Sequence, residues 1–268
     1  YMVGESGGSA FVIAYLFCLA LIGFPILVAE WLVGRRGQKN PINTFSDVAA
    51  SEGKSRSWGI VGATGILGGF LILSFYSVIG GWALNYITKV GSGSFAGQDG
   101  DSVAATFDAM LASAGTLTIW HTVFMAITAL IVGVGVTKGI ENTAKVLMPL
   151  LGVILFVIVG YNVMNGGFGQ AENYLFAPDL SKLNGDVMLA ALGHAFFTLS
   201  IGMGIMVAYG SYLGRDVNLL STARTVVILD TVIALAAGLA IFPIIFNNGL
   251  DPASGPGLIF VSLPIAFG

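Results

Sequence analysis

Six long apolar runs divide the chain into segments of membrane-spanning length. Their ranges are approximately 10–33, 58–88, 116–137, 146–165, 187–213 and 225–246. A helix needs about 20 residues to cross the roughly 30 Å hydrocarbon core of a bilayer, so each run is long enough to span it. The connections between the runs contain most of the charged residues, together with glycine, asparagine and serine. The pattern predicts an all-α integral membrane protein with six membrane-crossing segments.

The composition agrees with a bilayer environment and argues against two other classes of protein. Hydrophobic residues make up 56% of the 268 residues and charged residues only 9%, whereas soluble domains carry about a quarter charged residues. The sequence has no basic cluster beyond Arg35 and Arg36, which argues against nucleic-acid binding. It contains no phosphate-binding Gly-Lys-Ser/Thr loop, no His-Glu-x-x-His motif and no cysteine pair. We therefore expect a membrane protein that is not an enzyme.

The positions of lysine and arginine predict the orientation in the membrane. Alternate connections, at 34–57, 138–145 and 214–224, hold nine of the eleven basic residues. Short loops rich in these residues remain on the cytoplasmic side, so these three connections are predicted to be cytoplasmic. Tyr1 and Gly268 then lie on the outer side of a multi-pass protein. We expect this membrane to be the cell membrane, the inner one in a bacterium.

The apolar run at 187–213 contains a segment that is poorly suited to a continuous helix. Gly202 and Gly204 flank one residue, and each costs about 1 kcal/mol relative to alanine in a helix interior. Thr198 and Ser200 place hydroxyl groups immediately before them. One interpretation is a broken helix that lines a cavity and binds ions or substrate with its freed backbone groups. The other is a continuous helix whose glycines allow a close helix crossing.

Two acidic residues lie within or beside apolar runs. Asp230 has only apolar or hydroxyl-bearing neighbours, and a carboxylate in such a segment usually faces a cavity or binds a cation. It could also reach water at the cytoplasmic end, since Arg224 is only six residues earlier. Glu30 precedes Arg35 and Arg36 by little more than one helical turn. For Glu30 we predict an ion pair with these arginines or a side chain that reaches the interface.

Two other polar side chains in apolar runs have more than one interpretation. His194 is a candidate proton carrier or ligand, and equally a hydrogen-bonded histidine in the protein core. Tyr76 lies in the middle of the run at 58–88, where its hydroxyl needs a partner. That partner is either a neighbouring helix or a bound ligand. The residues alone leave both alternatives open.

Several motifs, in order along the whole chain, resemble the neurotransmitter:sodium symporters, whose members have the LeuT-like inverted-repeat fold. The motifs are Glu-Ser-Gly-Gly-Ser-Ala-Phe at 5–11, Glu-Trp-Leu-Val-Gly-Arg-Arg-Gly at 30–37, Lys-Gly-Ile-Glu at 138–141, Phe-Phe-Thr-Leu-Ser-Ile-Gly-Met-Gly at 196–204 and Gly-Pro-Gly-Leu-Ile-Phe-Val at 255–261. The resemblance implies an internal fragment that begins in the outer half of helix 1. Its parts would be the end of helix 1 at 1–6, helices 2 to 5 at about 10–33, 58–88, 116–137 and 146–165, broken helix 6 at 187–213, helix 7 at 225–246 and external loop 4 at 251–268.

The resemblance also implies a function and a set of site residues. It implies sodium-coupled symport of amino acids by alternating access, with sodium and the amino acid as ligands. The residues implied for the substrate pocket are Ile72, Tyr76, Phe197, Ser200 and Met203, with the Tyr76 hydroxyl donating to the substrate carboxylate. Those implied for one sodium site are Thr198 and Asp230, and those implied for the helix break are Gly202 and Gly204.

Three positions carry expectations about specificity. The family often has asparagine where Asp230 stands, and its chloride-dependent members bind chloride there through tyrosine, glutamine and serine. Tyr15 matches that tyrosine, whereas His194 replaces the glutamine. A fixed charge on Asp230 would replace chloride in offsetting the sodium charge, so we predict chloride-independent transport. Met203 stands where phenylalanine is common, and its flexible side chain suggests large apolar or aromatic substrates.

Two other functions remain open on the sequence. One is a proton-coupled amino-acid permease with the same fold, which would not depend on sodium. The other is a receptor or scaffold that keeps the fold and binds substrate without transporting it. The centre of helix 1, which distinguishes amino acids from monoamines in this family, is not in the sequence.

Overall fold

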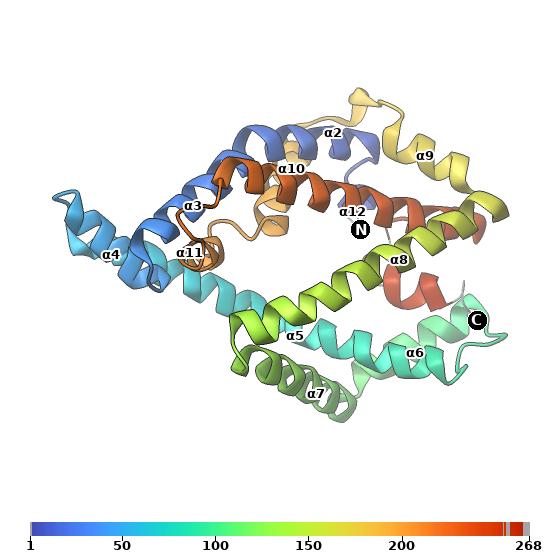
Figure 1. Ribbon diagram of the computed structural model, residues 1–268. Helices are drawn as coiled ribbons and strands as arrows, with labels where there is room; N and C mark the ends of the chain where they lie inside the picture. Colours follow the sequence, from blue (N-terminus) through green and yellow to red (C-terminus); the bar gives the residue numbers. More distant parts are fainter. Residues whose placement is uncertain (1, 254, 256–257, 265–268) are drawn as a thin grey trace. The chain divides into compact units, whose positions relative to one another are not determined.

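A computed structural model describes residues 2–253, 255 and 258–264, and all the regular structure within them is helical (Figure 1). The α-helices are α1 (Met2–Glu5), α2 (Ser9–Cys18), α3 (Phe24–Gly37), α4 (Pro41–Ser51), α5 (Gly59–Gly91), α6 (Gly100–Ala112), α7 (Ala114–Gly133), α8 (Asn142–Asn165), α9 (Phe168–Phe176), α10 (Gly185–Thr198), α11 (Ile205–Ser211) and α12 (Leu219–Asn247). Short π-helical segments occupy Leu19–Gly23, Val136–Glu141 and Leu258–Ser262, and 3₁₀ turns occupy Arg56–Trp58 and Leu180–Lys182.

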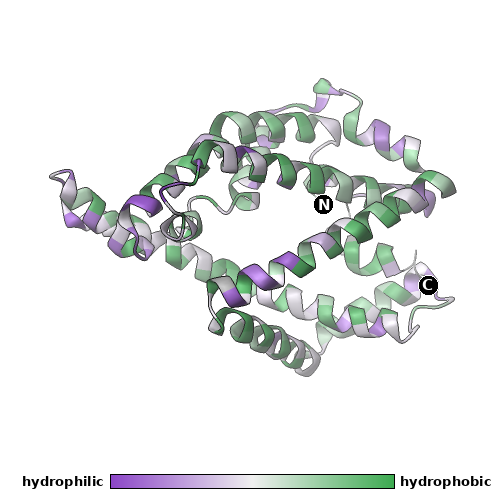
Figure 2. Ribbon diagram, in the orientation of Figure 1, coloured by the Kyte–Doolittle hydropathy of each residue, from purple (hydrophilic) through white to green (hydrophobic). Residues whose placement is uncertain are grey.

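Within the described residues, five helical stretches are long and apolar enough to cross a membrane. They are Ser9–Gly37, Arg56–Gly91, Ala114–Gly133, Lys138–Met164 and Leu219–Asn247. Figure 2 shows the predominance of apolar residues along α7 and the more polar character of α4. The apolar run at 187–213 is not among the five, because it is divided between the two shorter helices α10 and α11.

Several helices differ from the apolar runs at their ends. Helix α3 continues to Gly37 and α12 begins at Leu219, in both cases beyond the apolar residues. Charged side chains do not stop a helix, and near its ends they reach the lipid headgroups. Helix α7 instead ends at Gly133, four residues before the end of the apolar run. The reason is local, since Gly135 has a φ of 102°, which is incompatible with an α-helix.

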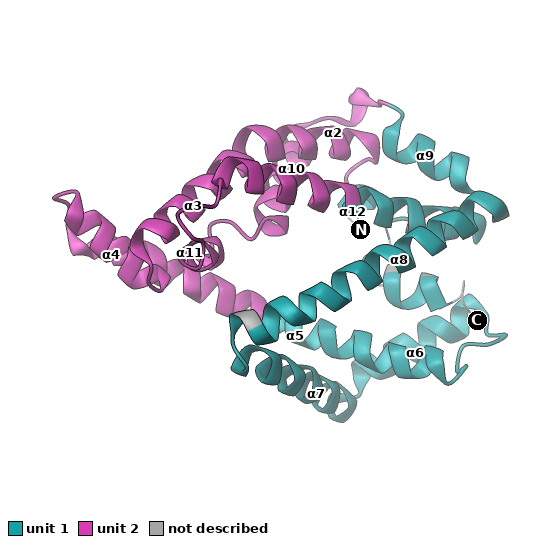
Figure 3. Ribbon diagram, viewed as in Figure 1, with its two compact units in different colours: residues 1–5, 74–177, 233–268 teal, residues 6–73, 178–232 magenta. Residues whose placement is uncertain are grey.

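The chain divides into two compact units, which are coloured separately in Figure 3. The first unit comprises residues 1–5, 74–177 and 233–268, and the second comprises residues 6–73 and 178–232. Helices α5 and α12 each contribute residues to both units. The residues around the helix break and Asp230 belong to the second unit.

In the second unit, α3 and α11 pack closely because both present glycine at their contact. A Cβ atom on Gly34 would overlap the carbonyl oxygen of Val207, and one on Gly210 would lie 2.6 Å from the carbonyl oxygen of Trp31. Small residues allow this approach of two backbones and are typical of helix packing in membranes. The two glycines therefore determine how α11 is held against α3.

The π-helical segment Leu19–Gly23 joins α2 to α3 in the same unit. Pro25 follows it, and in a regular helix a proline ring clashes with the carbonyl group four residues earlier, here that of Leu21. The wider π turn relieves this clash. A Cβ atom on Gly23 would lie 3.1 Å from the side chain of Leu199. The π turn therefore packs against the residue that follows α10.

Helix α4 is stabilised by an N-terminal cap and by surface charges. The Asn40 side chain accepts a hydrogen bond from the Asn43 N–H at 3.0 Å, and Pro41 occupies the first helical position. Lys39 Nζ lies 2.6 Å from Asp47 Oδ2. This hydrogen bond and the lysine charge hold the pKa of Asp47 below its usual range. Because the Lys39 side chain is 55% exposed and that of Asp47 is 33% exposed, water screens the ion pair and it contributes little to stability.

In the first unit, an aromatic cluster joins α5, α6 and the π-helical segment Leu258–Ser262. The Phe260 ring is stacked on Phe107 with centroids 5.5 Å apart, and it meets the edge of Tyr86 at 5.1 Å. Tyr86 is also stacked on Phe95 at 5.4 Å. Aromatic pairs at these distances are favourable beyond the area that they bury. The cluster holds the segment near the C-terminus against α5 and α6.

The first unit also contains a proline within a long helix and a side chain that compensates for it. Pro243 lies inside α12 and has no N–H, so it cannot donate to the carbonyl group of Leu239. The Asn162 Nδ2 of α8 donates to that carbonyl oxygen at 3.3 Å and to that of Ala240 at 2.8 Å. Asn162 is only 3% exposed. It therefore satisfies the carbonyl group of Leu239, which Pro243 would otherwise leave unpaired at membrane depth.

Replacing Asn162 with leucine is expected to lower the free energy of unfolding by about 1–3 kcal/mol, because it leaves the buried carbonyl group of Leu239 without a donor. The measurement is unfolding of the full-length protein in detergent. Val163→Leu is the matched control, since Val163 is 58% exposed and a substitution there is expected to change stability by less than about 0.5 kcal/mol. Equal stability of the two variants would contradict this role for Asn162.

Candidate functional site

The helix break lies between the end of α10 at Thr198 and the start of α11 at Ile205. Three residues in it have left-handed backbone conformations, Ser200 with a φ of 53°, Gly202 with 82° and Gly204 with 70°. Glycine adopts such angles without strain, whereas serine does so at a cost of the order of 1 kcal/mol. The chain therefore cannot continue as one helix, and backbone polar groups are free to bind other partners.

One of these backbone groups is bound by Glu30. The Gly202 N–H donates to Glu30 Oε1 at 2.6 Å. A carboxylate that accepts from a backbone N–H makes a strong, charge-assisted hydrogen bond. Glu30 belongs to α3 and is half-buried, so α3 supplies a negative charge directly at the break. This contact fixes the position of the unwound segment at its middle.

Of the two alternatives predicted for Glu30, the ion pair with Arg35 and Arg36 is wrong. Arg35 Nη1 donates to the carbonyl oxygen of Val217 at 2.8 Å, and Arg36 pairs with Glu52. The physical reason is helical spacing. Neighbours on a helix face are three or four residues apart, so residues five and six positions after Glu30 point elsewhere. Only the fold brings Gly202 to the face of α3 that carries Glu30.

Asp230 of α12 is the centre of a second polar cluster beside the break. Thr198 Oγ1 donates to this carboxylate and lies 3.1 Å from each of its oxygens. The Tyr15 hydroxyl of α2 donates to Asp230 Oδ2 at 3.2 Å. Within the part of the chain that the structure describes, Asp230 forms no ion pair. A half-buried carboxylate held by two hydroxyl groups and no cation is suited to bind a positive ion.

His194 joins this cluster through its ring. It lies four residues before Thr198 on α10, so both side chains are on one face of the helix. Its ring centroid is 5.2 Å from that of Tyr15 and 5.8 Å from that of Phe11. His194 is therefore placed against the tyrosine that donates to Asp230. The chain thus brings Tyr15, Thr198, His194 and Asp230 into one neighbourhood of the second unit.

The predicted substrate residues lie on two elements. Phe197, Ser200 and Met203 are in or beside the break, and Phe197 is 43% exposed. Ile72 and Tyr76 are four residues apart on α5 and therefore share one face of that helix. Ile72 belongs to the second unit and Tyr76 to the first.

The residues of α4 and α5 that pack against the break were not identified from the sequence. A Cβ atom on Gly65 would lie 2.9 Å from the backbone of Met203, and one on Gly204 would lie 3.2 Å from the Pro41 side chain. The signal that could have indicated this contact is the recurrence of glycine at 59, 62 and 65. This spacing of three places small residues along one helix face.

The chemistry of the cluster suits a hard cation rather than a transition metal. The hydroxyl of Thr198 and the carboxylate of Asp230 are oxygen ligands, which hard cations prefer. In the described ranges, no three side chains of His, Cys, Asp or Glu gather into a metal-binding group. The arrangement therefore offers oxygen ligands that suit a hard cation next to a broken helix.

Comparison with known proteins assigns the chain to a family. The sequence profile of the Sodium:neurotransmitter symporter family matches residues 1–99 and 101–267. The chain belongs to this family. Its members are secondary transporters, so membership confirms the prediction that the protein is not an enzyme.

Relatives in this family agree with the chain in sequence and in fold. The chain is 39% identical over its whole length to YhdH of Bacillus subtilis, an uncharacterized sodium-dependent transporter. It is 25% identical over 91% of its length to the sodium-dependent neutral amino acid transporter B(0)AT2 of Bos taurus, covering 37% of that protein. The crystal structure of MhsT in complex with L-phenylalanine matches 98% of the chain with a TM-score of 0.91 and 44% identity.

These comparisons confirm the all-α, LeuT-like fold and a multi-pass membrane protein. The chain spans 58% of the length of YhdH and 59% of the MhsT chain. The symporter family implies sodium as the coupling ion.

Proposed function

We propose that the full-length protein is a sodium-coupled symporter that carries amino acids across the cell membrane by alternating access. The observation that supports this most directly is the unpaired carboxylate of Asp230 beside the helix break, with the Thr198 hydroxyl donating to it. A sodium ion at this position would complete the charge balance of the site. Thr198 and Asp230 are the sodium ligands in this proposal, and the freed backbone of the break contributes to ion and substrate binding.

The proposed substrates are large hydrophobic or aromatic amino acids. MhsT, whose fold the chain shares, has been crystallised with L-phenylalanine, and the bovine relative is named a neutral amino acid transporter. Met203 supports the same substrate class because its flexible side chain adapts to bulky apolar groups. In this proposal Ile72, Phe197, Ser200 and Met203 surround the amino acid, and Gly202 and Gly204 keep the helix open beside them. The Tyr76 hydroxyl donates to the substrate carboxylate.

We further propose that transport does not require chloride. The negative charge of the Asp230 carboxylate would offset the sodium charge in a site of low dielectric constant, where an uncompensated ion is costly. Tyr15 holds this carboxylate in place, and His194 packs on the ring of Tyr15. In members that use chloride, this anion would supply the charge that Asp230 supplies here.

The test is uptake into proteoliposomes by the full-length protein under an imposed sodium gradient, with and without chloride. We expect sodium-dependent accumulation of labelled phenylalanine that is unchanged when gluconate replaces chloride. Competition by Trp, Tyr and Leu is expected to exceed competition by Ala and Gly. Accumulation driven equally by a proton gradient without sodium would instead indicate a proton-coupled permease. Binding of phenylalanine without accumulation under either gradient would indicate a receptor or scaffold.

A further inference from the structure

A basic pocket lies in the second unit, where α3 ends and the turn after α11 begins. Its volume is about 640 Å³, and it is lined by Leu32, Arg35, Arg36, Gln38, Leu213, Gly214 and Arg215. This volume is within the range of about 300–1,000 Å³ that is typical of small-ligand sites. The transport site proposed above uses none of these residues. The pocket is therefore a candidate binding site separate from the proposed transport site.

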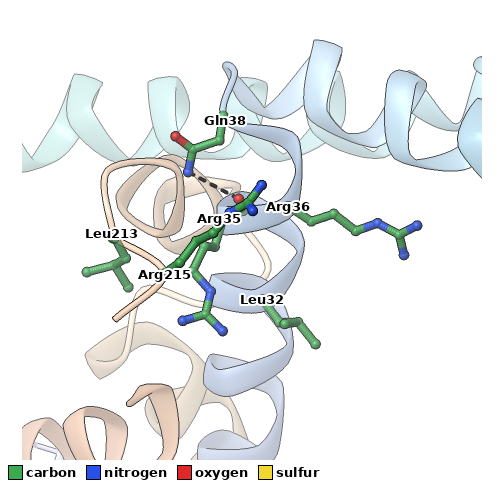
Figure 4. Close-up of a pocket in the computed structure, with 7 residues that line it drawn as sticks. Leu32, Arg35, Arg36, Gln38, Leu213 and Arg215 are labelled. Carbon is green, nitrogen blue, oxygen red and sulfur yellow. Dashed lines mark hydrogen bonds between the residues drawn. The ribbon is translucent and has the colours of Figure 1, made fainter. Parts of the chain in front are cut away.

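The three arginine side chains differ in the hydrogen bonds and ion pairs that they make within the protein. Arg36 pairs with Glu52, and Figure 4 shows its side chain extending away from Arg35 and Arg215. Arg35 donates one hydrogen bond, from Nη1 to the carbonyl oxygen of Val217, at 2.8 Å. A guanidinium has five N–H donors, so most of those on Arg35 remain available. Arg215 forms no hydrogen bond or ion pair within the described part of the chain.

The charges favour an anion. Arg35 and Arg215 place two guanidinium groups in one pocket, and a guanidinium binds phosphate with two parallel hydrogen bonds. Asp216 follows Arg215, and its Oδ1 would lie 2.4 Å from a Cβ atom on Gly214, but Asp216 is not among the lining residues. The lining itself therefore carries only positive charge.

The apolar part of the lining indicates that the anion belongs to a lipid rather than being a free ion. Leu32 is 52% exposed and Leu213 is half-buried, so leucine side chains lie beside the guanidinium groups. A soluble phosphate ion has no apolar part that could contact these leucine side chains. A phospholipid presents a phosphate and an acyl chain together, so it can contact both the guanidinium groups and the leucines. The pocket also lies at the end of the candidate span Ser9–Gly37, which places it at the headgroup level. Tyr212, next to Leu213, is 67% exposed, as is typical of an interfacial aromatic residue.

We propose that Arg35 and Arg215, with Leu32 and Leu213, form a binding site for an anionic phospholipid of the cytoplasmic leaflet. The guanidinium groups bind the phosphate and the leucines contact the start of an acyl chain. Anionic lipids are concentrated in that leaflet, and basic pockets between helices on that side are typical sites for their headgroups. This inference goes beyond the proposed transport function, and its test does not depend on transport.

The test is titration of the full-length protein in detergent with phosphatidylglycerol, with bound lipid counted by native mass spectrometry. Arg215→Gln is expected to weaken binding about tenfold, as for the loss of one charge-assisted contact. Arg215→Lys keeps the charge without the planar fork, and we expect an intermediate loss of about threefold. Arg224→Gln is the matched control, because Arg224 is exposed on α12 and outside the pocket, and we expect less than a twofold change there.

Three results would overturn the proposal. Equal weakening by Arg215→Gln and Arg224→Gln would mean that net charge alone attracts the lipid. Equal binding of phosphatidylcholine and phosphatidylglycerol would exclude recognition of an anionic headgroup. Displacement of the lipid by an equal concentration of inorganic phosphate would assign the site to a soluble anion. The unfolding temperature of each variant, measured in the same detergent, shows whether the protein remains folded.

Discussion

Asp230→Asn is expected to reduce sodium-driven uptake without chloride by at least about tenfold, and added chloride is expected to restore part of it. Asparagine keeps the shape and an acceptor oxygen for Thr198 and Tyr15, so the change removes mainly the charge. Two unit charges about 4 Å apart interact by about 4 kcal/mol at an effective dielectric constant of 20. Since each 1.4 kcal/mol is about tenfold in affinity, the loss of this attraction is large enough to limit sodium binding.

The measurement is uptake of labelled phenylalanine by the full-length protein in proteoliposomes, with chloride or gluconate as the anion. Asp186→Asn is the matched control, because Asp186 is exposed in the first turn of α10 and far along the helix from Thr198. It removes the same charge and is expected to leave uptake unchanged. Undiminished chloride-free uptake by Asp230→Asn would refute the role of Asp230 as a built-in anion.

Gly34→Ala is expected to destabilise the protein by about 3 kcal/mol or more and to abolish uptake. The added methyl group would overlap the carbonyl oxygen of Val207 and lie 3.0 Å from Gly210 Cα. Backbone atoms cannot move away as a flexible side chain can, so α11 must shift from α3. That shift would also disturb the hydrogen bond between Glu30 of α3 and Gly202 in the break.

Thermal unfolding in detergent and uptake in proteoliposomes test this prediction together. The control is Gly68→Ala, because a Cβ atom on Gly68 has open space around it. Alanine favours a helix over glycine by about 1 kcal/mol, so the control is expected to be neutral or slightly stabilising. If Gly34→Ala were as stable as Gly68→Ala, the close contact between α3 and α11 would not exist in the folded protein.

The local pattern of the sequence contains the information for the helices and for the interruption of one of them. Apolar runs of about 20 residues predict spanning helices because the bilayer has a defined thickness and leaves no backbone group unpaired. Gly202 and Gly204 marked a weak point in one run because their cost to a helix is a property of the residues themselves. Both have left-handed φ angles in the structure, and α10 and α11 lie on either side of them.

The sequence by itself therefore determined the all-α membrane fold, the family and a short set of polar candidates. Only the tertiary structure decided which of these candidates meet. Tyr15 is 215 positions from Asp230, and Glu30 is 172 positions from Gly202, so no local pattern could pair them. The prediction that Glu30 pairs with nearby arginines failed for this reason. Hydrogen-bond partners at membrane depth depend on which helix faces are in contact, and that depends on close packing such as that at Gly34 and Gly210.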